Sequence, residues 1–173
     1  MDYVTLLADD GTAVGTLPKS DVHTSDTPLH LAFSCYVFDA RGRLLLTRRS
    51  LAKRTWPGVW TNSFCGHPRP DEEMADAVRR RGIDELGVQL TGIRLALPDY
   101  RYRAVDASGI VENEICPVHV AVIDGEPEAD PDEVSEWTWV EVPALIEAVT
   151  HAPFAFSPWL VEQLPLLRRL GEV

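Results

Sequence analysis

The histidines are the residues of this chain that first suggest chemistry. Only five occur, and three of them, His23, His30 and His67, lie near predicted turns or strand ends beside polar residues. A single histidine is most often a structural or surface residue. Three histidines in similar surroundings indicate that their imidazoles could together bind one group. His119 and His151 lack such surroundings.

Two acidic residues could join these histidines. Glu112 and Glu114 are two residues apart in IVENEIC, so on a strand both side chains project from one face. An edge strand with a solvated face would explain them, but the apolar PVHVAVI that follows favours a strand through the core, where acids need a cation. Three imidazoles and two carboxylates would leave one position of an octahedron open, which suits Zn²⁺, Mn²⁺ or Mg²⁺.

A thiol precedes the third histidine. Cys65 and His67 occur in SFCGHP, where a strand would place the thiol beside the imidazole. A lone cysteine is usually a small buried apolar residue, but the glycine and the candidate ligand that follow favour a pocket. Further along, Arg81 and Glu85 are four residues apart on a predicted helix. Taken alone, they are best interpreted as an exposed ion pair worth about 0.3–0.5 kcal/mol.

The charge of the chain restricts its partners. A net charge of -11 disfavours nucleic acid and anionic membranes, because both bind positive surfaces. An anionic small molecule would need a local basic pocket. Six of the sixteen Lys and Arg lie between Arg41 and Arg54, and three more form the run from Arg79 to Arg81, so these are the candidate pocket cations.

The cysteines and the apolar segments indicate the compartment. The three cysteines have no paired spacing, which suits a reducing environment. No basic flank precedes an apolar stretch at the start, and no apolar run is long enough to span a bilayer. We therefore expect a soluble, cytoplasmic protein without a membrane partner.

The order of the predicted elements indicates an α+β fold. Hairpins are expected over residues 5–17 and 31–49, then a loop over 51–60 and a short strand ending at Gly66. Strands are expected over 94–103, 110–123 and 136–142, and helices over 71–87, 143–150 and 157–170, the last bent or interrupted near Pro165. The acidic segment 126–133 is expected to be a solvated loop without a partner. Residues 1–173 would form a single domain, a mixed sheet covered by helices.

Three separated motifs carry a family resemblance. TNSFCGHP, RYRA followed by GIVENEICPV, and FAFSPW resemble the type I isopentenyl-diphosphate isomerases, which have the Nudix fold, and the resemblance covers Lys19 to Trp159. A degenerate Nudix signature extends over residues 66–88. The positions that fit its spacing are Gly66, Glu72, Arg80, Glu85 and Gly87. Arg81 stands where a Nudix hydrolase would place the first glutamate of its metal cluster, so diphosphate hydrolysis is less expected.

The resemblance implies a reaction and a role for each site residue. The reaction would interconvert isopentenyl diphosphate and dimethylallyl diphosphate, as an isoprenoid precursor step, by protonation and deprotonation through a carbocation-like intermediate. A first metal, Mn²⁺ or Zn²⁺, would be bound by His23, His30, His67, Glu112 and Glu114. Mg²⁺ arriving with the diphosphate would be held by Glu85 and the backbone carbonyl of Cys65, while Lys19, Arg49, Lys53 and Arg81 would meet the phosphate oxygens.

Catalysis would depend on Cys65 and Glu114 as an acid–base pair. The resemblance places Tyr102 in a hydrogen bond near Glu114 and Trp159 over the reacting carbons. Which of Cys65 and Glu114 acts as the acid in each direction stays open. The protein is expected to act on this small molecule as a monomer.

Two other functions fit part of the pattern. A Nudix hydrolase would share the fold and the magnesium, but Arg81 and Cys65 argue against it. A non-catalytic metal-binding or prenyl-diphosphate-binding module would keep the metal ligands and would not need the acid–base pair.

Overall fold

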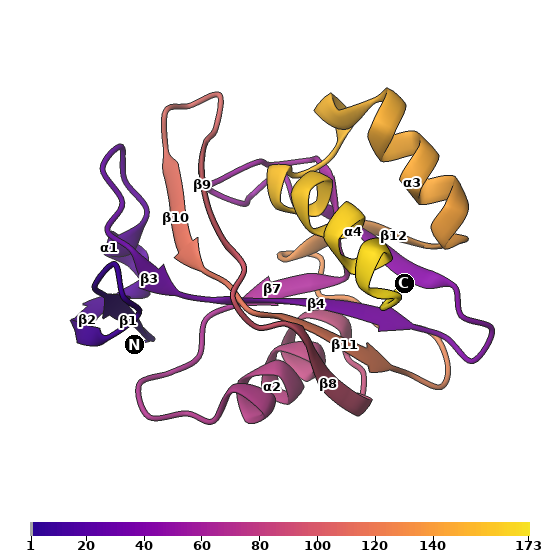
Figure 1. Ribbon diagram of the computed structural model, residues 1–173, viewed down its shortest axis with the longest axis horizontal. Helices are drawn as coiled ribbons and strands as arrows, with labels where there is room; N and C mark the ends of the chain where they lie inside the picture. The colour runs from indigo at the N-terminus through magenta and orange to yellow at the C-terminus, as the bar shows by residue number, and fades with distance from the viewer. Residues whose placement is uncertain (1) are drawn as a thin grey trace.

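The computed structural model describes residues 2–173, whose strands form two sheets flanked by helices (Figure 1). The five-stranded sheet has the order β2-β1-β3-β10-β9. Its strands are β1 (Tyr3–Leu7), β2 (Ala13–Pro18), β3 (His30–Leu31), β9 (Arg101–Val105) and β10 (Val111–Ile115). β3 and β10 are parallel, and the other pairs are antiparallel.

The second sheet has seven strands and is also mixed. Its main path is β12-β5-β4-β11-β8, with β6 paired to β5 and β7 paired to β4. The bounds are β4 (Phe33–Phe38), β5 (Leu44–Arg49), β6 (Trp60–Thr61), β7 (Phe64–Gly66), β8 (Thr91–Leu97), β11 (Val118–Val122) and β12 (Val134–Val140). The expected α+β class with a mixed sheet and flanking helices is confirmed, with two sheets in place of one.

The helices α2 (Met74–Leu86), α3 (Val142–His151) and α4 (Pro158–Leu170) cover the two faces of the seven-stranded sheet, with a 3-10 turn at Pro153–Ala155 between α3 and α4. The single-turn helix α1 (Lys19–Val22) contacts β1 and β2 of the five-stranded sheet instead. α2 lies on one side of the sheet, and α3 and α4 lie on the other (Figure 1). Successive side chains of β4 point to opposite faces of the sheet. Phe33 and Cys35 therefore pack in the apolar cluster that contains α2, whereas Tyr36 packs in the cluster that contains α3 and α4. None of the helices described is long and apolar enough to cross a bilayer.

Two segments expected to be single strands are each divided between the sheets. Residues 94–103 supply the end of β8 and the start of β9, and residues 110–123 supply β10 and β11. Pro98 and Pro117 lie at the two breaks. Proline has no amide hydrogen for a strand ladder, so the chain leaves one sheet there and enters the other.

The second hairpin opens soon after its turn. β4 and β5 are paired only at Phe38 and Leu44. β7 pairs with the beginning of β4, and β6 pairs with the end of β5. The short strand β7 therefore carries Cys65 into the region between the sheets.

The last helix is continuous through Pro165, so of the two effects expected from the sequence, a bend or an interruption, the interruption does not occur. Proline removes one helical hydrogen bond and crowds the preceding turn. The fully buried Leu160, Leu164 and Leu167 lie on both sides of it and pack into the core. Their packing outweighs the local penalty.

Candidate active site

A cavity of about 230 Å³ lies between the two sheets and α2. Its lining residues come from both sheets, from α1, α2 and α4, and from the loop after β5: Lys19, Ser20, His23, Arg49, Lys53, Arg54, Thr55, Cys65, Gly66, His67, Arg81, Glu85, Tyr102, Glu112, Glu114 and Trp159. Every residue to which the family resemblance gave a catalytic, phosphate-binding or metal-binding role lines this cavity except His30, which contacts Glu114. Of the other candidate cations, Arg54 lines the cavity, whereas Arg41, Arg43, Arg48, Arg79 and Arg80 do not. The predicted constellation is thus brought together.

Three imidazoles and one carboxylate converge at one end of the cavity. Ligand atoms of His23, His30, His67 and Glu114 all lie within 4.8 Å of one another. Nε2 of His30 and Nε2 of His67 are each 3.3 Å from Oε1 of Glu114. The fifth predicted ligand, Glu112, is outside this group of four, but its Oε2 lies 2.9 Å from Nε2 of His23.

Strand register creates this convergence. Parallel pairing of β3 with β10 places His30 opposite Glu114, and antiparallel pairing of β9 with β10 places Tyr102 opposite the same residue. His30, Glu114 and Tyr102 therefore form one row across three strands. His67 enters from the other sheet, one residue after β7 ends.

Several buried atoms in this cluster have no hydrogen-bond partner. Among residues 2–173, these atoms include Nε2 of His23, Nε2 of His30 and Oε2 of Glu112. A buried polar atom without a partner costs about 1–3 kcal/mol. Coordination of a divalent ion would satisfy them, and mixed imidazole and carboxylate ligands suit such an ion. The donor set therefore fits a metal.

The electrostatics of the cluster favour the metal-binding forms of His67 and Glu114, whereas at His30 burial is outweighed by contacts with Glu114 that raise its pKa. Burial lowers the pKa of His67 to about 4 despite its contact with Glu114, so its imidazole is neutral at pH 7. Burial opposes ionisation of Glu114, but contacts with His30 and His67 outweigh it and hold its pKa well below the usual range. A neutral imidazole and an ionised carboxylate are the forms that bind metals.

Cys65 is poised as a protonated thiol. Burial raises its pKa to about 12, and the nearby Glu114 carboxylate adds to the rise, while hydrogen bonds with Ser34 and Asn62 oppose it. Its Sγ lies 3.4 Å from Oγ of Ser34 and 3.5 Å from Oδ1 of Asn62. At neutral pH this group can therefore supply a proton.

An aromatic wall closes the side of the cavity near the thiol. Trp159 is 2% exposed, and its Nε1 donates to Oδ1 of Asn62 at 2.9 Å, the same oxygen that the Cys65 thiol contacts. Its ring lies 5.8 Å from that of Tyr102 and 5.5 Å from that of Trp56. The indole is thus held firmly beside the thiol.

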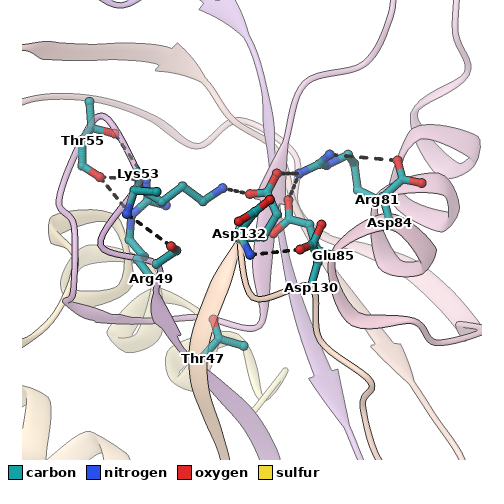
Figure 2. Close-up of polar contacts among 12 residues, drawn as sticks. Thr47, Arg49, Lys53, Thr55, Arg81, Asp84, Glu85, Asp130 and Asp132 are labelled. Atoms are coloured by element: carbon teal, nitrogen blue, oxygen red, sulfur yellow. Dashed lines mark hydrogen bonds and ion pairs between the residues drawn. The ribbon is translucent and has the colours of Figure 1, made fainter.

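Four cationic side chains form a second group in the same cavity, and one of them, Arg49, also lies 5.2 Å from the centre of the Trp159 ring. Lys19, Arg49, Lys53 and Arg81 all line the cavity. Figure 2 shows Lys53 and Arg81 extending toward each other, with Glu85 beside Arg81. Burial lowers the pKa of Lys53 to about 8, Glu85 opposes this change, and the neighbouring cations add to it. The Arg81–Glu85 pair is buried, so the expectation of an exposed helical pair is wrong.

One acidic residue that lies beside these cations was not identified from the sequence. The carboxylate of Glu133 bridges Lys53 and Arg81, with Oε1 3.3 Å from Nη2 of Arg81. The expectation that segment 126–133 is a solvated loop fails at its last residue, which contacts two cations of the cavity. Only tertiary structure shows this contact, because the acidic run looks uniform in sequence while Glu133 directly precedes β12, which pairs with β5 beside Lys53.

The candidate cations of the arginine run separate into two groups. Arg81 faces the cavity, whereas Arg79 pairs with Asp76 and Arg80 pairs with Glu72. Arg80 also donates to the carbonyl of His67 at 3.2 Å. The signature residues Glu72 and Arg80 therefore hold the loop that carries a metal-ligand candidate.

Comparison with known proteins agrees with this fold. The chain matches the NUDIX domain over residues 28–160. A crystal structure of a protein from Deinococcus radiodurans superposes with a TM-score of 0.75 at 19% identity, covering 98% of this chain and 99% of that one. A MutT protein from Methanosarcina mazei Go1 superposes with a TM-score of 0.66 at 19% identity, covering 84% and 97%. The chain belongs to the Nudix family.

More similar relatives define its place within that family. Isopentenyl-diphosphate Delta-isomerases are 62% identical in Clavibacter michiganensis, over 96% of this chain and 86% of the relative, and 56% identical in Corynebacterium glutamicum, over 98% and 93%. Within the Nudix family, the chain belongs to the isopentenyl-diphosphate Delta-isomerases.

Proposed function

We propose that this chain interconverts isopentenyl diphosphate and dimethylallyl diphosphate, using Cys65 and Glu114 as its acid–base pair. The reaction adds a proton to the terminal alkene carbon and removes a different proton from the carbon nearer the diphosphate. The observation that supports it best is the convergence of a protonated thiol and an ionised carboxylate on one cavity that is also lined by four cationic side chains.

The alkene is a very weak base, so protonation generates positive charge on the tertiary carbon. The ring of Trp159 can stabilise that charge by cation–π attraction, worth about 2 kcal/mol when water is excluded. Water in the site would trap the cation as an alcohol. The buried indole, with Tyr102 and Trp56 packed around it, provides a dry wall.

Proton transfer requires one group that carries a proton and another that can accept one. Cys65 begins protonated and Glu114 begins ionised, so in one direction the thiol can donate and the carboxylate accept. Tyr102 lies opposite Glu114 across the strands and is proposed to relay its proton. Which partner donates to isopentenyl diphosphate is not assigned by these positions.

Two divalent ions fit the proposed function. His23, His30, His67, Glu112 and Glu114 would hold Mn²⁺ or Zn²⁺, and Glu85 with the Cys65 carbonyl would hold Mg²⁺ that arrives with the diphosphate. The first ion would supply positive charge that fixes the Glu114 carboxylate. Lys19, Arg49, Lys53 and Arg81 would anchor the phosphate oxygens and thereby position the five-carbon tail.

A diphosphate hydrolase is the main alternative. Helix α2 presents Arg81 and Glu85 to the cavity, so the Arg81 guanidinium takes a place where a hydrolase would use a carboxylate. A simple binding module would have no use for the thiol and carboxylate poised in opposite protonation states. Both features favour isomerisation.

The test is an assay with isopentenyl diphosphate, Mg²⁺ and Mn²⁺ that measures dimethylallyl diphosphate and free phosphate together. We expect isomer without phosphate release. Rapid phosphate release without isomer would establish the hydrolase instead, and neither product would favour the binding module.

We propose that residues 1–173 act as one isomerase domain, as a monomer, in the cytoplasm. Sedimentation at micromolar concentration would test the monomer, and a dimer would contradict it.

A further inference from the structure

Thr55 forms a close contact with a predicted metal ligand. It lies in the loop between β5 and β6 and is 4% exposed. Its Oγ1 donates to Oε1 of Glu112 at 2.6 Å, within the range of hydroxyl bonds to ionised carboxylates. Glu112 is 6% exposed, so water does not readily replace this bond.

This bond gives the two carboxylate oxygens of Glu112 different surroundings. Oε1 is occupied by the Thr55 hydroxyl, while Oε2 lies 2.9 Å from Nε2 of His23. These two atoms are in contact, but neither forms a hydrogen bond within the described chain, so both could bind a metal ion. The hydroxyl therefore fixes the carboxylate plane with its free oxygen directed at the imidazole.

The main chain that carries the hydroxyl is itself fixed. Nη2 and Nε of Arg49 donate to the Thr55 carbonyl at 2.8 and 3.1 Å, and Nε also donates to the Trp56 carbonyl at 3.1 Å. Trp56 has a φ of 42°, a conformation that costs a bulky residue energy and persists only where surrounding contacts hold it. The Arg49 bonds are such contacts.

We infer that Thr55 is a positioning residue for the first metal, acting through the orientation of Glu112. The inference rests on the metal centre of the proposed function and adds a residue outside its ligand set. Groups that hydrogen-bond to metal ligands commonly change metal affinity by about 10–100-fold. Because Thr55 is also held by Arg49, the same loop joins the metal end and the diphosphate end of the cavity.

The test measures the affinity of metal-free protein for Mn²⁺ or Zn²⁺ by competition with a chromogenic chelator, without substrate. Thr55→Val keeps the shape and removes the hydroxyl, so we expect affinity to fall about 10–100-fold. Thr55→Ala also lacks the hydroxyl and should fall similarly. Thr55→Ser keeps it and should stay within about three-fold of wild type, because only the methyl group is lost.

Thr47→Val is the matched control. Thr47 is also a buried threonine, but its Oγ1 donates to the main-chain carbonyl of Asn62 at 2.9 Å and not to a metal-ligand candidate. Metal affinity should be unchanged in this variant. Equal losses in the Thr47 and Thr55 valine variants, or in Thr55→Ser and Thr55→Val, would overturn the inference.

The outcomes separate this inference from the proposed function. Wild-type affinity in Thr55→Val, with metal bound by wild type, overturns the positioning role alone. Failure of wild type to bind either ion overturns the metal centre together with the inference.

Discussion

Glu114 takes part in three arrangements at once. It lies opposite His30 on β3, opposite Tyr102 on β9, and 3.3 Å from Nε2 of His67. The proposed role of Glu114 as both metal ligand and acid–base group is consistent with this position. Its neighbour Glu112 faces Thr55 and His23 instead, so two acids on one strand face acquire different surroundings.

Lys53 should give the reaction a pH dependence above neutrality. Its pKa of about 8 means that it is charged at pH 7 and loses its proton as the pH rises through that value. A charged hydrogen bond contributes about 1.5–3 kcal/mol, so kcat/KM should fall roughly ten-fold or more on the alkaline side.

Lys53→Arg provides the control for this prediction. Arginine stays charged throughout this range, so the decline near pH 8 should disappear from the pH profile of kcat/KM. A decline of the same size and midpoint in the arginine variant would assign the titration to another group.

At the scale of elements, the close approach of β7 and α2 determines how the site is assembled. Gly66 ends β7, and a Cβ built on it would lie 2.8 Å from Cγ of Arg81 and 2.8 Å from Cζ of Phe33. Only a residue without a side chain lets the helix bring Arg81 against the strand that carries Cys65. This contact explains the glycine of the signature.

Gly66→Ala should therefore destabilise the fold and displace Arg81. Overpacking costs about 1–3 kcal/mol, which corresponds to a fall in Tm of roughly 2–10 °C for a chain of this size. KM for the diphosphate should rise as well. Gly15→Ala is the control, because a Cβ there meets nothing within 4 Å; an equal loss in both variants would contradict the steric argument.

The elements also show what the sequence could and could not predict. Local patterns predicted α2, α3 and α4 because caps and periodicity are short-range, as with Gly87, which ends α2 with a φ of 65°. The single-turn helix α1 was not predicted, because four residues are too few to show a helical period. The division of residues 110–123 between two sheets depends on which strands they meet across the molecule. The same limit applies to Glu133 and Thr55, whose partners lie 52 and 57 residues away in the sequence.

At the scale of the whole molecule, the candidate metal-binding cluster of His23, His30, His67 and Glu114 connects the two sheets. His30 and Glu114 belong to the five-stranded sheet, and His67 directly follows β7 of the seven-stranded one. An ion bound there would bind the folded state selectively. The residues of the cluster could be predicted from the sequence, because few residue types bind metals. The close approach of the two sheets could not be predicted from it.

Metal removal should therefore lower the stability of the folded chain. Binding at a concentration 100 times Kd contributes about 2.7 kcal/mol, so chelation should lower Tm by roughly 5–10 °C. Adding Mn²⁺ or Zn²⁺ back should restore it. In His67→Ala the difference between metal-loaded and chelated protein should shrink strongly, and a full-sized difference there would place the ion elsewhere.

Isomerisation in D₂O tests the central claim most directly, because protonation from an exchangeable thiol or carboxylate must transfer solvent deuterium to carbon. We expect dimethylallyl diphosphate with deuterium in the newly formed methyl group, and almost no labelled product from Cys65→Ala or Glu114→Gln although both still bind the diphosphate. Unlabelled product from wild type, or labelling at the wild-type rate in either variant, would contradict the account.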